Sequence, residues 1–90
     1  MLPYLDDFSR ILKIERNYSN NTISSYLSDL KSFNNFLEEN EISFKKLNNK
    51  HTKLFFRNLS DRKFSPRTIK RKLASLSSYF SFLLDREVIK

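Results

Sequence analysis

Apolar residues recur at three- and four-residue spacing along most of this chain, which is the period of an amphipathic α-helix. The longest such run follows three helix-capping residues, Ser19, Asn20 and Asn21, and continues to about Asn40. Its apolar stripe is Ile23, Tyr26, Leu27, Leu30, Phe33 and Leu37. The pattern predicts one long helix whose apolar face packs against a core.

Two other segments show the same period over shorter lengths. A first helix is predicted from about Pro3 to Arg16, because Pro suits a first helical turn and apolar residues follow it. Its expected stripe is Tyr4, Phe8, Ile11 and Ile14. A shorter helix is predicted at 50–62, with inward residues Leu54, Phe55 and Leu59. The connection before it carries apolar residues that should cover the core: Ile42, Phe44 and Leu47.

The fourth predicted helix has the clearest start in the sequence. Ser65 is a good N-cap, and Pro66 follows at the first helical position, where its missing N–H costs nothing. The expected core stripe is Ile69, Leu73, Leu76, Phe80 and Leu83. Tyr79 and Phe82 lie beside this stripe and are expected to pack against the first helix or another neighbour. The helix is predicted to end near Arg86, and the abrupt stop after it is typical of a domain cut from a longer protein.

Composition favours an all-α fold. The chain contains no Gly and only two Pro, so it lacks the residues that β-hairpin turns use most often. Its 90 residues can build one modest core and are too few for a second one. Residues 1–90 are therefore expected to form a single all-α domain.

Several classes of function are excluded by the residues that are missing. The chain has no Cys, and its single His51, expected at the surface in the first turn of the third helix, cannot hold zinc alone. Paired carboxylates, a nucleophile elbow and a phosphate loop are also absent, so no catalytic residue, metal or cofactor is expected and the domain should not be an enzyme. No apolar run reaches the ~20 residues of a membrane span and no secretory signal is present, so the expected location is the cytoplasm.

The net charge of +7 is concentrated in the second half of the chain. Residues 1–45 contain five Lys and Arg against seven Asp and Glu, whereas residues 46–90 contain twelve against three. Six of the eleven residues from Arg62 to Lys72 are basic. Nucleic acid, an anionic membrane surface and an acidic protein are all partners that such charge attracts.

The helix faces opposite the predicted core narrow this choice. On the fourth helix, Arg67 and Arg71 are expected to point away from the core with Lys70 and Thr68 beside them, while Lys72 adds only to the general field. The second helix should expose short polar side chains: Asn21, Ser25, Ser28 and Ser32. Capped helix N-termini bind phosphate, and short side chains allow a helix to enter a DNA groove closely. These features favour binding to double-stranded DNA.

Other interpretations stay open at this point. The basic run has the composition of an ordinary solvated face. A small helical protein-interaction domain would use the same basic face on an acidic partner. A helix-turn-helix regulator ranks lower, because it needs two short helices and a tight turn, usually with Gly.

Two stretches of the sequence resemble the N-terminal core-binding domain of tyrosine recombinases, the Xer and phage-integrase family. The first is YLDDFSRILKIERNYSNNTISSYLSDLKSFNNFLEEN, whose matching positions are Glu15, Arg16, Ser19, Thr22, Tyr26, Asp29, Leu30 and Phe33. The second is SPRTIKRKLASLSSYFSFLL, which is similar to the family's Ser-Pro-x-Thr-Ile-x-Arg-x-Leu pattern. Together they cover nearly the whole chain. Glycines common in the family's loops are replaced here by Asn40 and Lys63, and Lys adopts the left-handed conformation poorly.

The resemblance implies a four-helix bundle of the SAM-like type that forms one half of a clamp around DNA. The second and fourth helices would then cross the major groove, with contacts from Asn21, Thr22, Ser25, Ser65, Arg67, Thr68, Lys70 and Arg71. The family's nucleophilic tyrosine belongs to a separate catalytic domain, so none of the four Tyr here is expected to be catalytic. The resemblance also implies a tetramer on DNA for the full-length protein, and we expect the 90-residue domain alone to be monomeric.

Overall fold

Four α-helices and one short 3₁₀ helix make up the computed structural model, which describes residues 2–89. In chain order they are α1 (Leu5–Ile14), α2 (Asn20–Glu39), η1 (Phe44–Lys46), α3 (Asn49–Asp61) and α4 (Pro66–Asp85). No strand occurs in this part of the chain. The all-α fold and the four predicted helices are confirmed.

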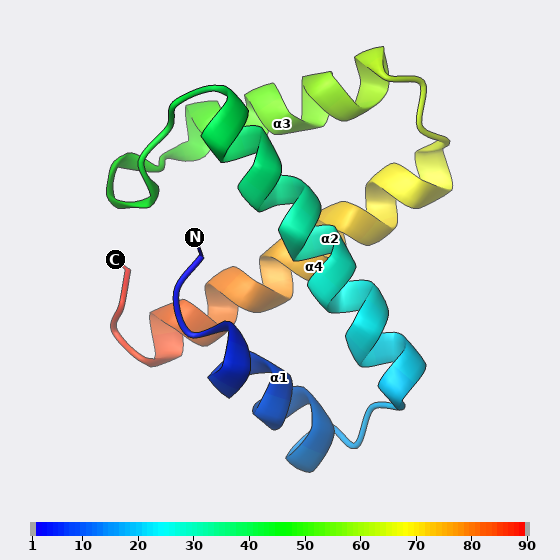
Figure 1. Ribbon diagram of the computed structural model, residues 1–90, viewed down its shortest axis with the longest axis vertical. Helices are drawn as coiled ribbons and strands as arrows, with labels where there is room; N and C mark the ends of the chain where they lie inside the picture. The colour runs from blue at the N-terminus through cyan, green and yellow to red at the C-terminus, as the bar shows by residue number, and fades with distance from the viewer. Residues whose placement is uncertain (1, 90) are drawn as a thin grey trace.

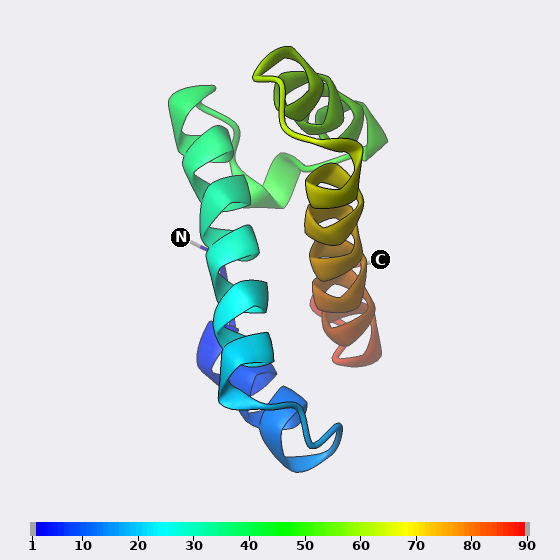
Figure 2. The same ribbon diagram turned by 90° about the vertical axis from the view of Figure 1, so that its right-hand side faces the viewer.

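The two long helices, α2 and α4, cross one another at the centre of the fold (Figure 1). α1 packs on α2 and α3 packs on α4, so each long helix has one short partner. Seen from the side, α2 and α4 form two adjacent layers (Figure 2). Both long helices begin on the right-hand side of Figure 1, whereas the segments near the two chain ends lie on the left. The starts of the two predicted DNA-binding helices therefore share one side of the molecule.

Serine caps begin both long helices, as predicted. The Ser19 hydroxyl accepts a hydrogen bond from the Thr22 N–H at 3.2 Å, and the Ser65 hydroxyl accepts one from the Thr68 N–H at the same distance. In each pair the two hydroxyl oxygens are also 3.0 Å apart and hydrogen-bonded. Pro66 occupies the first turn of α4. The caps satisfy one free N–H of each helix and leave others open towards solvent.

A capping box begins α3. The Asn48 side chain accepts a hydrogen bond from the Lys50 N–H at 2.9 Å, and the His51 Nδ1 accepts one from the Asn48 N–H at 3.3 Å. His51 thus lies in the first turn of α3, as predicted, but it is half-buried and has a capping role.

Each of the four α-helices ends in a reversal at a left-handed residue that is not glycine. These residues are Asn17 (φ 52°), Glu41 (φ 53°), Lys63 (φ 61°) and Glu87 (φ 59°). The following residue donates its N–H back into the last turn at 2.8 to 3.3 Å: Tyr18 to Leu12, Ile42 to Leu37, Phe64 to Leu59 and Val88 to Leu83. The sequence predicts that Lys63 and Asn40 stand where the family has loop glycines. Lys63 does occupy a left-handed position, which glycine adopts most easily. Asn40 does not, because its φ is −103° and the left-handed residue is Glu41.

The short helices bury fewer residues than predicted. Tyr4 precedes α1 in a left-handed conformation (φ 61°), which interrupts the helix expected to start at Pro3. Ile14, predicted in the apolar stripe, ends α1 and is 70% exposed. α1 therefore ends two residues before the predicted Arg16, and the chain reverses at Asn17. In α3, Leu54 is exposed although an inward position was expected.

Aromatic side chains from all four helices fill the core. Phe33 of α2 packs edge-to-face against Phe55 of α3, with ring centroids 5.0 Å apart. Phe8 of α1 contacts Tyr79 and Phe82 of α4 at 5.6 and 5.2 Å. The prediction that Tyr79 and Phe82 pack against the first helix is confirmed. The connecting residues predicted to cover the core also pack against it: Ile42, Phe44 and Leu47.

The buried face of α4 is turned relative to the predicted one. Leu73 and Phe80 are only half-buried, whereas Lys72, Ser75 and Tyr79 are buried. The buried stripe lies about 70° around the helix from the predicted line. The cause is a polar contact, because α4 meets α2 through Ser75 and Lys72 rather than through an apolar stripe alone.

A buried phenol ties the start of the chain to α4. The Tyr79 hydroxyl donates a hydrogen bond to the Pro3 carbonyl at 2.7 Å, and the Tyr79 side chain is fully buried. Burial raises the pKa of Tyr79 well above its ordinary value. Leu2 is buried beside this contact. The segment before α1 is thus part of the packed domain.

Candidate nucleic-acid interface

Two basic side chains begin the exposed face of α4. Arg67 and Lys70 are both exposed, and the stripe continues with short side chains: Ala74, Ser77 and Ser81. Ser78 is half-buried and accepts a hydrogen bond from Arg16 at 3.3 Å. The exposed face therefore carries its charge in the first turns and becomes small and neutral further along.

The start of α2, on the same side of the molecule, presents short uncharged side chains. Asn21, Thr22 and Ser25 are exposed, and Ser28 continues the series one turn later. On α4, Ser65 is exposed and Thr68 is half-buried, since its hydroxyl is hydrogen-bonded to the cap. Seven of the eight residues predicted for DNA contact are accordingly at the surface, and the eighth, Thr68, is partly covered.

A buried carboxylate joins α2 to α4. Asp29 of α2 is only 1% exposed. Its Oδ1 accepts a hydrogen bond from Arg71 Nη2 at 2.8 Å, and its Oδ2 accepts bonds from Arg71 Nε at 3.2 Å and from the Ser75 hydroxyl at 2.8 Å. Lys72 Nζ lies 3.4 Å from Oδ1. Four hydrogen bonds and two positive charges compensate the burial of this charge.

Arg71 was predicted to point freely into solvent. It is instead paired with Asp29. It holds Asp29 by one edge of its guanidinium group, and this hydrogen bonding raises the pKa of Arg71 above its ordinary value. The side chain is still 53% exposed. Because a guanidinium group has five N–H donors, the others face the solvent at the rim between the two helices.

Lys72 is not the general surface charge that the sequence predicted. It is 7% exposed, and its ammonium group pairs with Asp29 and lies 5.5 Å from the centre of the Phe64 ring. The buried face of α4 is rotated from the predicted one, and this rotation places Lys72 under α2 instead of at the surface. Its charge is therefore fixed in place.

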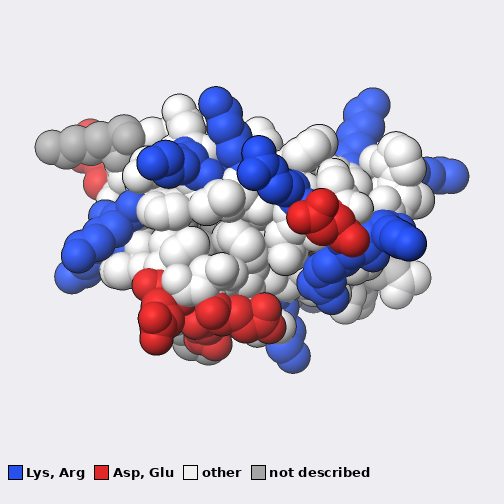
Figure 3. All heavy atoms as spheres, turned by 90° about the horizontal axis from the view of Figure 1, so that it is seen from above, with Lys and Arg blue, Asp and Glu red and all other residues white. Residues whose placement is uncertain are grey.

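Acidic and basic side chains occupy different parts of the surface. The exposed acids Glu38, Glu39 and Glu41 follow one another at the end of α2. Seen from above Figure 1, the acidic side chains gather mainly along one edge, while Lys and Arg spread over the others (Figure 3). Since α2 has 20 residues, about 30 Å separates its acidic end from its neutral start.

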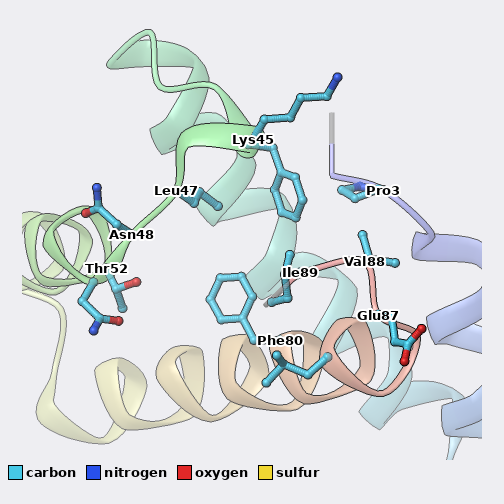
Figure 4. A pocket seen from close by; sticks show the side chains of 12 residues that line it. Pro3, Lys45, Leu47, Asn48, Thr52, Phe80, Glu87, Val88 and Ile89 are labelled. Atoms are coloured by element: carbon cyan, nitrogen blue, oxygen red, sulfur yellow. The ribbon is translucent and has the colours of Figure 1, made fainter.

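An apolar groove lies beside Pro3 and Ile89, which are near the two ends of the described part of the chain. It has a volume of about 810 Å³ and lies between η1, the start of α3 and the end of α4. Leu47, Phe80, Val88 and Ile89 surround it, while the Lys45 side chain extends away from it (Figure 4). This groove is separate from the basic face and offers little that would bind phosphate.

The described residues hold neither a metal centre nor a membrane span. Within 2–89, no three His, Asp or Glu side chains gather closely enough to hold a metal ion. None of the helices in that range is both long and apolar enough to cross a bilayer.

Comparison with known proteins assigns the chain to a family. Residues 5–87 match the family described as phage integrase, N-terminal SAM-like domain. The chain belongs to this family of helical N-terminal domains, as the resemblance of its sequence indicated. Its similarity extends to the tyrosine recombinase XerC of Anoxybacillus flavithermus, with 37% identity over 86 residues, which cover 94% of this chain and 29% of that protein.

Other tyrosine recombinases XerC show the same relationship. The protein of Listeria welshimeri is 37% identical over 83 residues, covering 91% of this chain and 28% of the relative. The protein of Staphylococcus haemolyticus is 31% identical over 80 residues, covering 89% and 27%. The chain thus spans less than a third of the length of these relatives. No solved structure gives a significant match.

The position of Asp29 was not predicted as a link between the helices. One signal in the sequence points to it, because Asp29 precedes Phe33 by four residues and Phe36 by seven. Residues at these spacings share one helix face, so an acid there is expected to be buried with the two aromatic residues. A buried acid needs a cationic partner, and the basic run of the fourth helix supplies it.

Proposed function

We propose that this chain binds double-stranded DNA as the N-terminal domain of a tyrosine recombinase. The observation that carries the proposal is that the basic start of α4 and the neutral start of α2 lie on the same side of the molecule, which faces the viewer in Figure 2. The proposed contacts are Asn21, Thr22, Ser25, Ser65, Arg67, Thr68, Lys70 and Arg71.

Each group has a distinct part in the proposed complex. Arg67 and Lys70 neutralise backbone phosphates, and the open N–H groups at the two helix starts add contacts to phosphate oxygens. Asn21 and Ser25 are short enough to let α2 approach base edges in the major groove. Arg71, held by Asp29, offers its free donors at the crossing of the two helices.

The proposed function does not include cleavage of DNA by this domain. Tyr79 is fully buried and hydrogen-bonded to the Pro3 carbonyl, so its hydroxyl cannot meet a phosphate without unfolding. We expect the catalytic tyrosine in the remainder of the recombinase, tetramer formation on DNA as a property of that complete protein, and a monomeric state for this domain alone.

Titration of labelled duplex DNA carrying a recombination half-site, at several salt concentrations, tests the proposal. The logarithm of the binding constant should fall linearly with the logarithm of salt concentration, by about 0.9 per phosphate contacted. Changing Arg67 and Lys70 together to Ala should weaken binding and reduce this slope, with unchanged helix content. The matched control changes Lys13 and Lys46, which are exposed on α1 and η1, to Ala. A folded protein that binds no duplex at low salt would refute the proposal.

The alternative function is recognition of an acidic protein through the same basic face. It predicts a discrete protein partner and no salt-dependent affinity for duplex DNA. The same titration therefore separates the two functions, and the Arg67 and Lys70 variants would then lose the protein partner only.

A further inference from the structure

A second, polar groove lies between α2, α3 and the first half of α4. Its volume is about 290 Å³, which is enough for a phosphate group and the waters around it. Hydroxyl and amide side chains line it, including Ser32 of α2 and Asn58 of α3. The only aromatic side chain among the lining residues is Phe36, so the groove is suited to a polar ligand.

Three cationic side chains border this groove and one carboxylate opposes them. The cations are Lys31 of α2, Arg62 at the end of α3 and Lys72 of α4, and the acid is Glu39. Asp29 is engaged with Arg71, Lys72 and Ser75 and is not among the lining residues. The balance of charge at the groove is therefore positive.

Two of the cations contact the same aromatic ring. The guanidinium carbon of Arg62 lies 5.1 Å from the centre of the Phe64 ring, and Lys72 Nζ lies 5.5 Å from it. Both cations also line the groove, so an anion bound there would be attracted by both charges.

The ammonium group of Lys72 has donors to spare. An ammonium group has three N–H donors, and the hydrogen bond recorded for Lys72 is the one to Asp29 at 3.4 Å. Its side chain is 9% exposed, so water supplies little of the missing hydrogen bonding. A phosphate oxygen in the groove would satisfy these donors.

We propose that this groove binds a phosphate of the DNA backbone. The inference rests on the proposed function and extends it, because the groove adds a phosphate site formed by Lys31, Arg62 and Lys72 to the eight residues at the helix starts. The two surfaces adjoin, since Lys72 and Arg71 share Asp29. Occupation of the groove would thus connect α3, which carries none of the eight residues, to the bound DNA.

Titration with inorganic phosphate, followed by NMR of the ¹⁵N-labelled domain, tests the site directly. The side-chain amide signal of Asn58 and the backbone signals of Ser32 and Lys72 should shift together and saturate. Changing Lys31 and Arg62 to Gln should abolish these shifts; both residues are exposed, so the fold should survive. Unspecific shifts spread over all exposed lysines, or none at the groove, would overturn the site.

DNA binding then tests the assignment of the occupant. The Lys31→Gln, Arg62→Gln protein should bind duplex several-fold more weakly, with a salt slope lower by about 0.9 for one lost phosphate. A Lys13→Gln, Lys46→Gln control loses the same charge away from the groove and should keep the slope.

The inference and the proposed function fail in different ways. If the unaltered domain binds duplex and the groove variant behaves like the control, the groove inference is wrong and the proposed function stands. If the unaltered domain binds no duplex, the proposed function and the assignment of DNA as the occupant are both wrong. In that case phosphate-induced shifts at Asn58 would still support the anion site itself.

Discussion

Asp29 and Arg71 lie 42 positions apart in the chain and meet through two parallel hydrogen bonds between carboxylate and guanidinium groups. Each belongs to one of the two stretches that resemble the recombinase family. The pair therefore gives a physical reason why the two stretches occur together in one chain, because the first supplies the buried acid on α2 and the second supplies its partner on α4. It also fixes the direction of a guanidinium group that we propose at the DNA surface.

Loss of the Asp29 charge should destabilise the domain. In Asp29→Asn the amide cannot accept the same set of bonds, and the buried Lys72 ammonium loses its partner. We expect the free energy of unfolding to fall by about 2–4 kcal/mol, measured by urea denaturation. As a control, Asp7→Asn removes the surface contacts to Arg10 and Arg86 and should change stability by less than about 0.5 kcal/mol. Equal effects of the two changes would contradict the role given to Asp29.

Arg71→Lys should separate charge from geometry. Lys keeps the positive charge but cannot form the two-point contact with Asp29 and does not hold a fixed direction. We expect weaker binding to duplex DNA with a nearly unchanged salt slope, and a loss of about 1 kcal/mol in stability. Isothermal titration at several salt concentrations measures the affinity and the salt slope, and urea denaturation measures the stability. Binding as tight as that of the unaltered domain would mean that the fixed direction of Arg71 is unimportant.

Stability should decline in alkaline solution because of Tyr79. The phenol of an unfolded chain ionises near pH 10, at about its ordinary pKa of 10, whereas burial raises the pKa of Tyr79 in the folded domain. The stabilisation is therefore fully present below about pH 10 and is lost as pH rises further. Tyr79→Phe should reduce this pH dependence and, at neutral pH, lower stability by about 1 kcal/mol through loss of the bond to Pro3.

The dependence of stability on alkaline pH that persists in Tyr79→Phe should come mainly from Tyr26. Burial is the largest cause that raises the pKa of Tyr26. Chemical unfolding at about pH 8 and about pH 11 measures the difference for each protein. An identical alkaline loss in the Tyr79→Phe protein would exclude Tyr79 as its source.

Lys63→Gly should stabilise the domain. Lys63 has φ 61°, where a side chain is strained and glycine is not, and its N–H already donates to the Ser60 carbonyl. The expected gain is about 0.5–1 kcal/mol after allowance for the greater freedom of glycine in the unfolded chain, seen as a higher melting temperature. Asn40→Gly is the control, because Asn40 has φ −103° and its side chain donates to the Phe36 carbonyl at 2.8 Å. That change should destabilise.

The period of apolar residues was sufficient to locate the helices but not to orient them. Ser19, Ser65 and Pro66 marked the starts of α2 and α4 correctly, because a cap depends on nearby residues alone. The buried face of α4 depends on its crossing with α2, which is a contact between distant residues. Lys72 and Ser75 are polar, so a pattern of apolar positions assigns them to the surface even though Asp29 draws them inward.

In the candidate site, too, local features were predicted correctly and contacts between distant residues were not. Arg67 and Lys70 were expected at the surface and are exposed, and no carboxylate within residues 2–89 forms an ion pair with them. Arg71 was expected to be free and is paired, and the groove cations Lys31 and Arg62 come from helices whose approach the sequence does not specify. Charge and helix starts are local properties, whereas which charges pair is a tertiary one.

The burial of Lys72 also provides a reporter of motion between the two long helices. An amine-selective reagent can modify the many exposed lysines of the native domain directly, whereas the nearly buried Lys72 ammonium, paired with Asp29, should react slowly and become faster to react when α2 and α4 separate. The rate at which Lys72 is labelled, followed by mass spectrometry, would therefore measure how often the crossing opens. The same measurement in the presence of DNA would show how strongly a bound duplex keeps it closed.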